Sequence, residues 1–381
     1  MPHHIDTAPY PTRQAPRHPF PVQALPPSDE SREVLHNEVH ARPPARIRLP
    51  ALVVYVAVLN EGVTREQECA HLRALSGQDD LPVQALAGNF LRLRFDNYTL
   101  KWERHTEFSR YSLVQKLPDD ALNGGDEAAL LQSLVIPPSW WAAIPGKTVT
   151  AIMMAMVHGD VDDPTAMRRT AEPWLDSREP LASLLGVRRS CAMSNFRLRD
   201  SGFERLLVIS PPNTSELRAG RLSQRLLEVE TYRLMALRGL PVAKAVGAQL
   251  SLAERELANI TAALQNKAAQ DQTMLDRLIG LAASVELITA EHAFRFAATA
   301  AYDKLVRERI TELRESPISG TQSIGEFMQR RLSPAMATVA ATAKRLSDLS
   351  ERISRTSALL RTRVDIATEE QNSQLLAKLT K

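Results

Sequence analysis

The stretch from Ser333 to Lys381 contains no glycine and a single proline, Pro334. Glycine usually ends a helix, and proline breaks a helix interior but fits the first turn. The stretch therefore predicts one helix with Ser333 as its N-cap. Two helices of ~45 residues would each be about 65 Å long at ~1.5 Å per residue, which indicates an elongated stalk. No stop signal precedes Lys381, so we expect the natural helix to continue beyond the given sequence.

A seven-residue repeat runs along this helix. Leu346, Ile353 and Leu360 recur at the period of a coiled coil. A second position holds small residues three residues before each of these, and a valine four residues after Leu360. The repeat predicts a narrow seam through which the stalk assembles with copies of itself into a homo-oligomer. The predicted seam residues are Ala343, Leu346, Ser350, Ile353, Ser357, Leu360 and Val364.

The remainder of the chain predicts two further segments. Residues 1–27 contain eight prolines, which is typical of an extended or disordered tail. Residues 28–212 mix strand and helix patterns and predict an α+β or mixed α/β domain. Residues 213–381 show only helical periodicity, and we expect antiparallel long helices packed like a coiled coil. The predicted fold class is thus a mixed domain followed by an all-α stalk.

Local signals fix several elements. Ala51–Leu59 is a continuous valine-rich run, which favours a strand buried on both faces. Thr64 and Gln67 form a capping box at the start of a helix. A second buried strand is expected over residues 148–157, and a hairpin turning at residues 200–202. A long helix should span residues 271–314.

Charge and apolar content exclude some classes of partner. Residues 217–381 hold 24 Lys and Arg against 18 Asp and Glu, and the two signs are interspersed, which is typical of solvated helix faces. We therefore expect no nucleic-acid binding. The longest apolar run is far shorter than the ~20 residues that span a bilayer. Cys69 and Cys191 lie far apart, which favours buried thiols in a reducing, cytoplasmic compartment.

Two histidines could share a metal ion. His36 and His40 are spaced i, i+4, which places both on one face of a helix. Glu38 lies roughly 200° around the helix from His36 at ~100° per residue, so it cannot reach the same ion. The alternative is a structural or interface role, in which Glu38 pairs with Arg42.

A second cluster contains Glu103, His105 and Glu107. If this segment is one strand, the three side chains project from one face. Two carboxylates beside a histidine can bind a divalent cation. The alternative is the solvated face of a half-buried sheet. A metal site would require His36 or His40 to come within reach of this cluster.

Three motifs together resemble a known family. They are His36-Asn-Glu-Val-His-Ala-Arg-Pro-Pro44, Trp102-Glu-Arg-His-Thr-Glu-Phe108, and Arg361-Thr-Arg-Val-Asp-Ile366 with Gln371-Asn372. The chain is similar along nearly its whole length to an uncharacterised bacterial family, domain of unknown function 3422, described as predicted membrane-anchored proteins. The resemblance implies a short apolar anchor beyond Lys381 and a place at the cytoplasmic face of the inner membrane. It implies no catalytic residue.

Two functions follow as hypotheses. The first is a non-enzymatic scaffold or transport-related protein, self-associating and attached to the membrane through a segment absent here. Its order of parts is similar to that of CorA-type magnesium channels, by analogy of layout alone. The second is a metal-dependent enzyme or metal sensor whose divalent ion is held by the histidines and carboxylates above.

Overall fold

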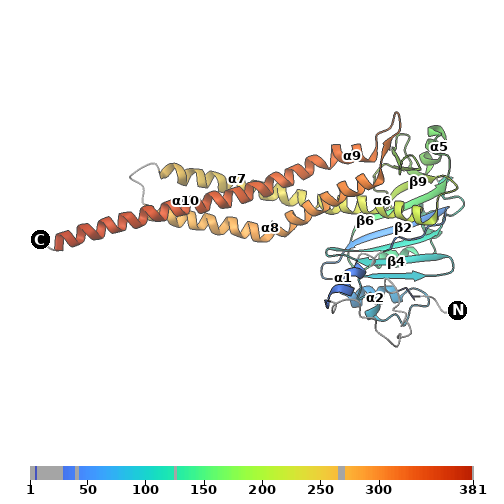
Figure 1. Ribbon diagram of the computed structural model, residues 1–381, viewed down its shortest axis with the longest axis horizontal. Helices are drawn as coiled ribbons and strands as arrows, with labels where there is room; N and C mark the ends of the chain where they lie inside the picture. Colours follow the sequence, from blue (N-terminus) through green and yellow to red (C-terminus); the bar gives the residue numbers. More distant parts are fainter. Residues whose placement is uncertain (1–4, 7–28, 39–42, 124–126, 265–270, 380–381) are drawn as a thin grey trace. The chain divides into compact units, whose positions relative to one another are not determined.

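The computed structural model describes residues 5–6, 29–38, 43–123, 127–264 and 271–379 (Figure 1). The chain forms two compact units, Met1–Thr231 with Val306–Phe327, and Tyr232–Leu305 with Met328–Lys381. The division differs from the expected boundary after residue 212. Helices α6 (Glu216–Leu237) and α8 (Asp271–Leu313) each run from one unit into the other. The proline-rich tail lies outside the described residues, except for Ile5–Asp6, which forms strand β1.

Ten described strands form one mixed sheet in the first unit, in the order β1-β3-β4-β5-β2-β6-β9-β8-β7-β10. Among them β6 and β9 run parallel, and the other neighbours are antiparallel. After β1, the strands are β2 (Ala51–Leu59), β3 (Phe90–Arg94), β4 (Tyr98–Arg104), β5 (Phe108–Lys116), β6 (Lys147–His158), β7 (Leu181–Leu185), β8 (Ser190–Ser194), β9 (Glu204–Ser210) and β10 (Ser316–Pro317).

Strand β2 lies at the centre of the sheet because it is apolar on both faces. Residues 51–58 are all buried, as the valine-rich run predicts. The second predicted strand is β6, and the predicted hairpin is β8–β9, whose strands pair antiparallel. The capping box of Thr64 and Gln67 is present in full at the start of α2 (Arg65–Arg73).

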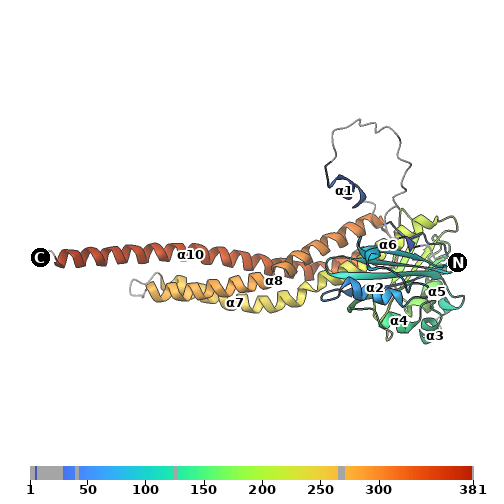
Figure 2. The ribbon, with the colours of Figure 1, turned by 90° about the horizontal axis from the view of Figure 1, so that it is seen from below.

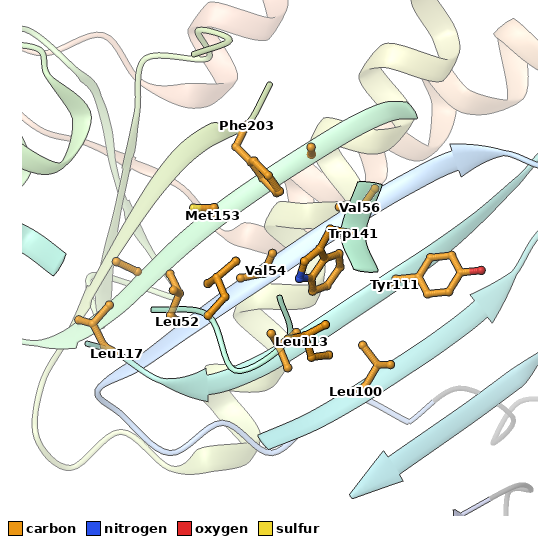
Figure 3. Packing of buried hydrophobic residues seen from close by; sticks show 14 of the residues in the cluster. Leu52, Val54, Val56, Leu100, Tyr111, Leu113, Leu117, Trp141, Met153 and Phe203 are labelled. Atoms are coloured by element: carbon orange, nitrogen blue, oxygen red, sulfur yellow. The ribbon is translucent and has the colours of Figure 1, made fainter. Parts of the chain in front are cut away.

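One face of the sheet holds the main apolar core. Its residues include Val54, Tyr111 and Trp141, which Figure 3 shows together. The helices on this face are α2, α3 (Glu127–Gln132), α4 (Pro138–Ala142) and α5 (Pro164–Leu175), with the short turn η1 (Val83–Leu86). In Figure 2 they lie on the side of the sheet opposite α6. Two further short elements are α1 (Arg32–Glu38) and η2 (Ala121–Asn123).

The opposite face of the sheet is covered by α6. The hydroxyls of Tyr55 on β2 and Thr231 on α6 are 2.8 Å apart. Near its start, α6 contacts the extended segment that precedes β2, because the Ile47 amide donates to the Glu216 carbonyl. A Cβ at Gly220 would lie 1.6 Å from the Ala45 carbonyl oxygen. Glycine is therefore required at position 220 for this close backbone approach.

The second unit is built from α7 (Gly239–Ala263), α8 and α10 (Ser333–Leu379). Helix α9 (Ile324–Arg331) precedes α10. Buried residues on α7 recur at alternating steps of three and four: Ala243, Val246, Leu250, Ala253, Leu257 and Ile260. The structure thus confirms a mixed α+β domain followed by long helices.

Candidate functional site

A group of charged side chains is buried between the sheet and α6. Glu103 on β4 is fully buried and faces Arg110 on β5, its cross-strand partner. Arg110 Nε and Nη2 donate to the two Glu103 carboxylate oxygens at 2.6 and 2.9 Å, and Lys101 Nζ lies 3.0 Å from Oε2. Arg110 Nη1 also reaches Glu228 of α6 at 3.4 Å, and Arg309 of α8 donates to that carboxylate at 2.6 Å. The pairs join two strands to two helices.

Burial and pairing shift the pKa values of this group. Burial opposes ionisation of Glu103, but Arg110 and Lys101 outweigh it and hold the pKa of Glu103 well below its ordinary value. Burial lowers the pKa of Lys101, against the opposing effect of Glu103. Burial also acts against the charge of Arg110, yet Glu103 raises the Arg110 pKa above its ordinary value. The Glu103 carboxylate is therefore ionised at neutral pH, and its oxygens are paired with Arg110 and Lys101.

The three residues predicted to bind metal, Glu103, His105 and Glu107, do not lie on one strand, because a turn follows Glu103 and Arg104. Strand β4 ends at Arg104 and β5 begins at Phe108, so the condition that one strand runs through this segment is not met. Glu103 is buried against Arg110, whereas the His105 ring stacks on Phe108 with centroids 4.5 Å apart. Glu107 lies in the turn. Cross-strand pairing with a cation, rather than solvation, explains why Glu103 points inward.

The other two predicted ligands lie in or near α1. His36 is exposed on this helix, and His40 lies outside the described residues. In the part of the chain that the structure describes, no three His, Cys, Asp or Glu side chains are grouped to hold a metal ion. A metal site that includes His40 stays a prediction.

The predicted seam faces the interior of the second unit. Leu346, Ile353 and Leu360 are buried, as is Leu349, three residues after the first of them. Ala343, by contrast, is half-buried. The remaining predicted members of the seam, Ser350, Ser357 and Val364, are half-buried too. The leucine and isoleucine positions thus pack within one chain, and the second buried row lies one residue earlier than the predicted one.

A pocket rich in arginine opens on the first unit, and we call it the arginine pocket. It has a volume of about 400 Å³ and lies between the β7–β8 turn, the first half of α6 and the end of α8. Its charged lining consists of Arg189, Arg218, Arg221, Arg225, Arg314 and Glu312. Sequence reasoning missed it, because the partners of the α6 arginines come from distant segments. The spacing of Arg218, Arg221 and Arg225 at i, i+3 and i+7 was the visible signal.

Comparison with protein families gives one match. The model for a protein of unknown function, DUF3422, matches residues 27–381. The chain belongs to this family. The match to DUF3422 confirms the resemblance drawn from the three motifs and covers both structural units. Neither the curated proteins nor the solved structures gave a match.

A helix that spans a bilayer needs about 20 predominantly apolar residues. No helix within the described ranges combines the length and the apolar content needed to cross a bilayer.

Proposed function

We propose that this chain is a non-enzymatic, self-associating protein whose second unit provides the assembly surface. The observation that carries the proposal is an apolar groove of about 420 Å³ between α7 and α8. Two of its leucines are largely exposed, Leu252 at 62% and Leu287 at 68%. Exposed apolar grooves of this kind mark protein interaction sites.

The energetics favour covering this groove. Burying one leucine side chain stabilises by about 1.5–3 kcal/mol. In a symmetric dimer both chains cover Leu252 and Leu287, which gives four contributions, each about two thirds of this value because the side chains are 62% and 68% exposed. Leu346, Ile353 and Leu360 are already buried within the chain. The groove is therefore a better assembly surface than the seam predicted from the sequence.

We further propose antiparallel, coiled-coil packing inside the second unit. Its support is the three–four spacing of buried residues on α7 and the pairing of Arg277 on α8 with Glu256 near the end of α7. Gly239, at the start of α7, lies against Thr299 in the later part of α8. Contacts that pair the start of one helix with the end of another are those of antiparallel neighbours.

Sedimentation velocity of the full chain tests self-association. We expect the chain to dimerise at micromolar concentration, and the double variant Leu252→Glu with Leu287→Glu to remain monomeric. The matched control is Leu375→Glu with Leu376→Glu, two leucines of α10 that are 58% and 64% exposed. This control should dimerise like the wild type. A monomeric wild-type chain, or equal loss in both variants, would contradict the proposal.

The family resemblance also supports a proposed location in the cell. We propose that the protein is held at the cytoplasmic face of the bacterial inner membrane, as a scaffold or a part of a transport assembly with a CorA-like layout. Its support is the order of parts, a sheet domain followed by long helices. Fractionation of cells that express the chain with its natural downstream sequence tests the anchor. Recovery of the protein outside the membrane fraction would contradict the proposed membrane location.

A further inference from the structure

We propose that the arginine pocket binds a small anion that carries two or more phosphate groups. Three separate segments build it. Arg189 is the last residue of the β7–β8 turn, Arg218 and Arg221 lie on the first half of α6, and Arg314 directly follows α8. The inference is independent of self-association, because the pocket belongs to the first unit and the α7–α8 groove to the second.

The charge of the pocket is not balanced by its own carboxylate. Arg225 Nε donates to Glu312 at 3.2 Å, and Arg309 donates to the other oxygen of Glu312 at 2.6 Å. Glu312 is therefore already shared by two guanidinium groups. Arg189, Arg218, Arg221 and Arg314 have no ion pair with a carboxylate elsewhere in the described chain.

Four guanidinium groups around one concave space repel one another, and an anion would relieve this repulsion. The guanidinium group presents a planar fork of donors that matches the oxygens of phosphate and carboxylate groups. The α6 N-terminus adds a partial positive charge at the same end of the pocket, since α6 begins at Glu216. All of these groups favour negative charge at one place.

The two walls of the pocket are tied together by the backbone. The Gly186 amide donates to the Leu313 carbonyl at 2.9 Å, which joins the β7–β8 turn to the end of α8. The floor is apolar and well packed, because Leu185 and Leu313 are 1% and 2% exposed. Arg218 and Arg221 are thus presented by a helix, and Arg189 and Arg314 by two turns that this backbone bond joins.

The spacing of the arginines points to more than one phosphate group. Arg218 and Arg221 lie about 4.5 Å apart along α6 at ~1.5 Å per residue, and Arg189 and Arg314 reach the pocket from two other segments. A single phosphate does not balance four guanidinium groups from three segments, whereas a diphosphate or triphosphate carries the additional charge and oxygens. None of the described residues that line the pocket is aromatic, so a nucleobase has no side chain there on which to stack. Recognition therefore falls on the phosphate groups themselves.

The same chemistry occurs in free oligophosphates and in the headgroup of a diphosphate lipid such as cardiolipin. The concave shape and the volume of about 400 Å³ favour a small free ligand. Calorimetric titration of the full chain at about 0.15 M salt, where surface charges are screened, tests this. We expect tripolyphosphate and pyrophosphate to bind at least tenfold more tightly than orthophosphate.

A double variant that reverses two charges in the pocket locates the site. In Arg218→Glu with Arg221→Glu we expect the Kd for tripolyphosphate to rise about 100-fold, since each lost charge-assisted contact costs about tenfold. The matched control is Arg168→Glu with Arg169→Glu, two exposed arginines of α5 outside the pocket. Its Kd should stay within about twofold of wild type, apart from the general effect of the charge change. Circular dichroism confirms that each variant is folded, and Arg218→Gln replaces the double variant if that one is not.

Three results would overturn the proposal. One is the absence of oligophosphate binding by the wild-type chain. Another is an equal loss of binding in the pocket variant and in the Arg168 and Arg169 control, which would indicate a general effect of charge. The third is co-sedimentation with phosphatidylethanolamine vesicles that contain cardiolipin, lost in the pocket variant, without binding of soluble oligophosphate.

Discussion

Replacing Glu103 with glutamine should strongly destabilise the first unit. Glutamine keeps the size of the side chain but removes the negative charge that Arg110 and Lys101 share. Both cations would then stay buried, with Glu228 the remaining acidic contact of Arg110 at 3.4 Å. The substitution therefore leaves a buried charge excess rather than an empty space.

The magnitude follows from the number of contacts that are lost. Glu103 accepts two bonds from Arg110 and pairs with Lys101, and hydrogen bonds to charged groups contribute about 1.5–3 kcal/mol each. Glutamine can retain one of them as an acceptor. Removing one partner of a buried pair typically costs about 3–5 kcal/mol. We expect a loss of this size in the free energy of unfolding.

Urea denaturation followed by tryptophan fluorescence measures this loss. All four tryptophans (Trp102, Trp140, Trp141 and Trp174) lie in the first unit, so the signal reports on that unit. The control is Glu61→Gln, at an exposed position next to β2, where the change should be within about 0.5 kcal/mol. A loss below about 1 kcal/mol for Glu103→Gln would refute the reasoning that the pair is tightly held.

The dependence on pH gives a second readout of the same group. The pKa of Glu103 is lowered in the folded chain from an ordinary value of 4.5. Its contribution to stability is therefore complete above pH 4.5 and is lost as the pH falls through the folded value. The wild-type chain should lose stability below pH 4.5 more steeply than Glu103→Gln. Equal slopes would show that Glu103 is not the group responsible.

Three further substitutions test separate features. Gly220→Ala places a Cβ 1.6 Å from the Ala45 carbonyl oxygen, so thermal unfolding should show a loss of more than about 2 kcal/mol. Thr64→Ala removes the capping box with Gln67 and should cost about 1 kcal/mol in urea denaturation. Burial lowers the pKa of His71 from 6.5 to about 4, so wild-type stability should fall as the pH drops from 6.5 to 4; this slope should be absent in His71→Leu.

Local patterns were enough to predict the central strands and the capped start of α2. A valine-rich run such as Ala51–Leu59 is stable when both faces are covered, and the structure covers both. The Thr64 cap depends on residues three apart, so it needs no distant partner. The hairpin at residues 200–202 is equally local.

Features that depend on distant partners were not predictable. Alternation along β4 places Glu103 on one face, but it cannot tell that α6 covers that face and that Arg110 is its cross-strand neighbour. The arginine pocket likewise needs Arg189 and Arg314, which are separated from α6 in the sequence. The second row of the seam was predicted one residue too late. The small residue at position 343 and the large residue at position 349 each fit a seven-residue repeat, so the repeat alone does not choose between the two rows.

The path of the chain makes the first unit discontinuous. After α6 the chain leaves for the second unit, and it returns through the end of α8 to add β10 at the edge of the sheet beside β7. Glu228 and Arg309 pair at 2.6 Å across this excursion, so its two ends lie close together. Residues 232–305 are thus an insertion that a short linker can replace, whereas truncation at residue 212 would strip α6 and β10 from the sheet. A minimal version of the sheet domain therefore needs an internal deletion of residues 232–305 in addition to removal of residues 328–381.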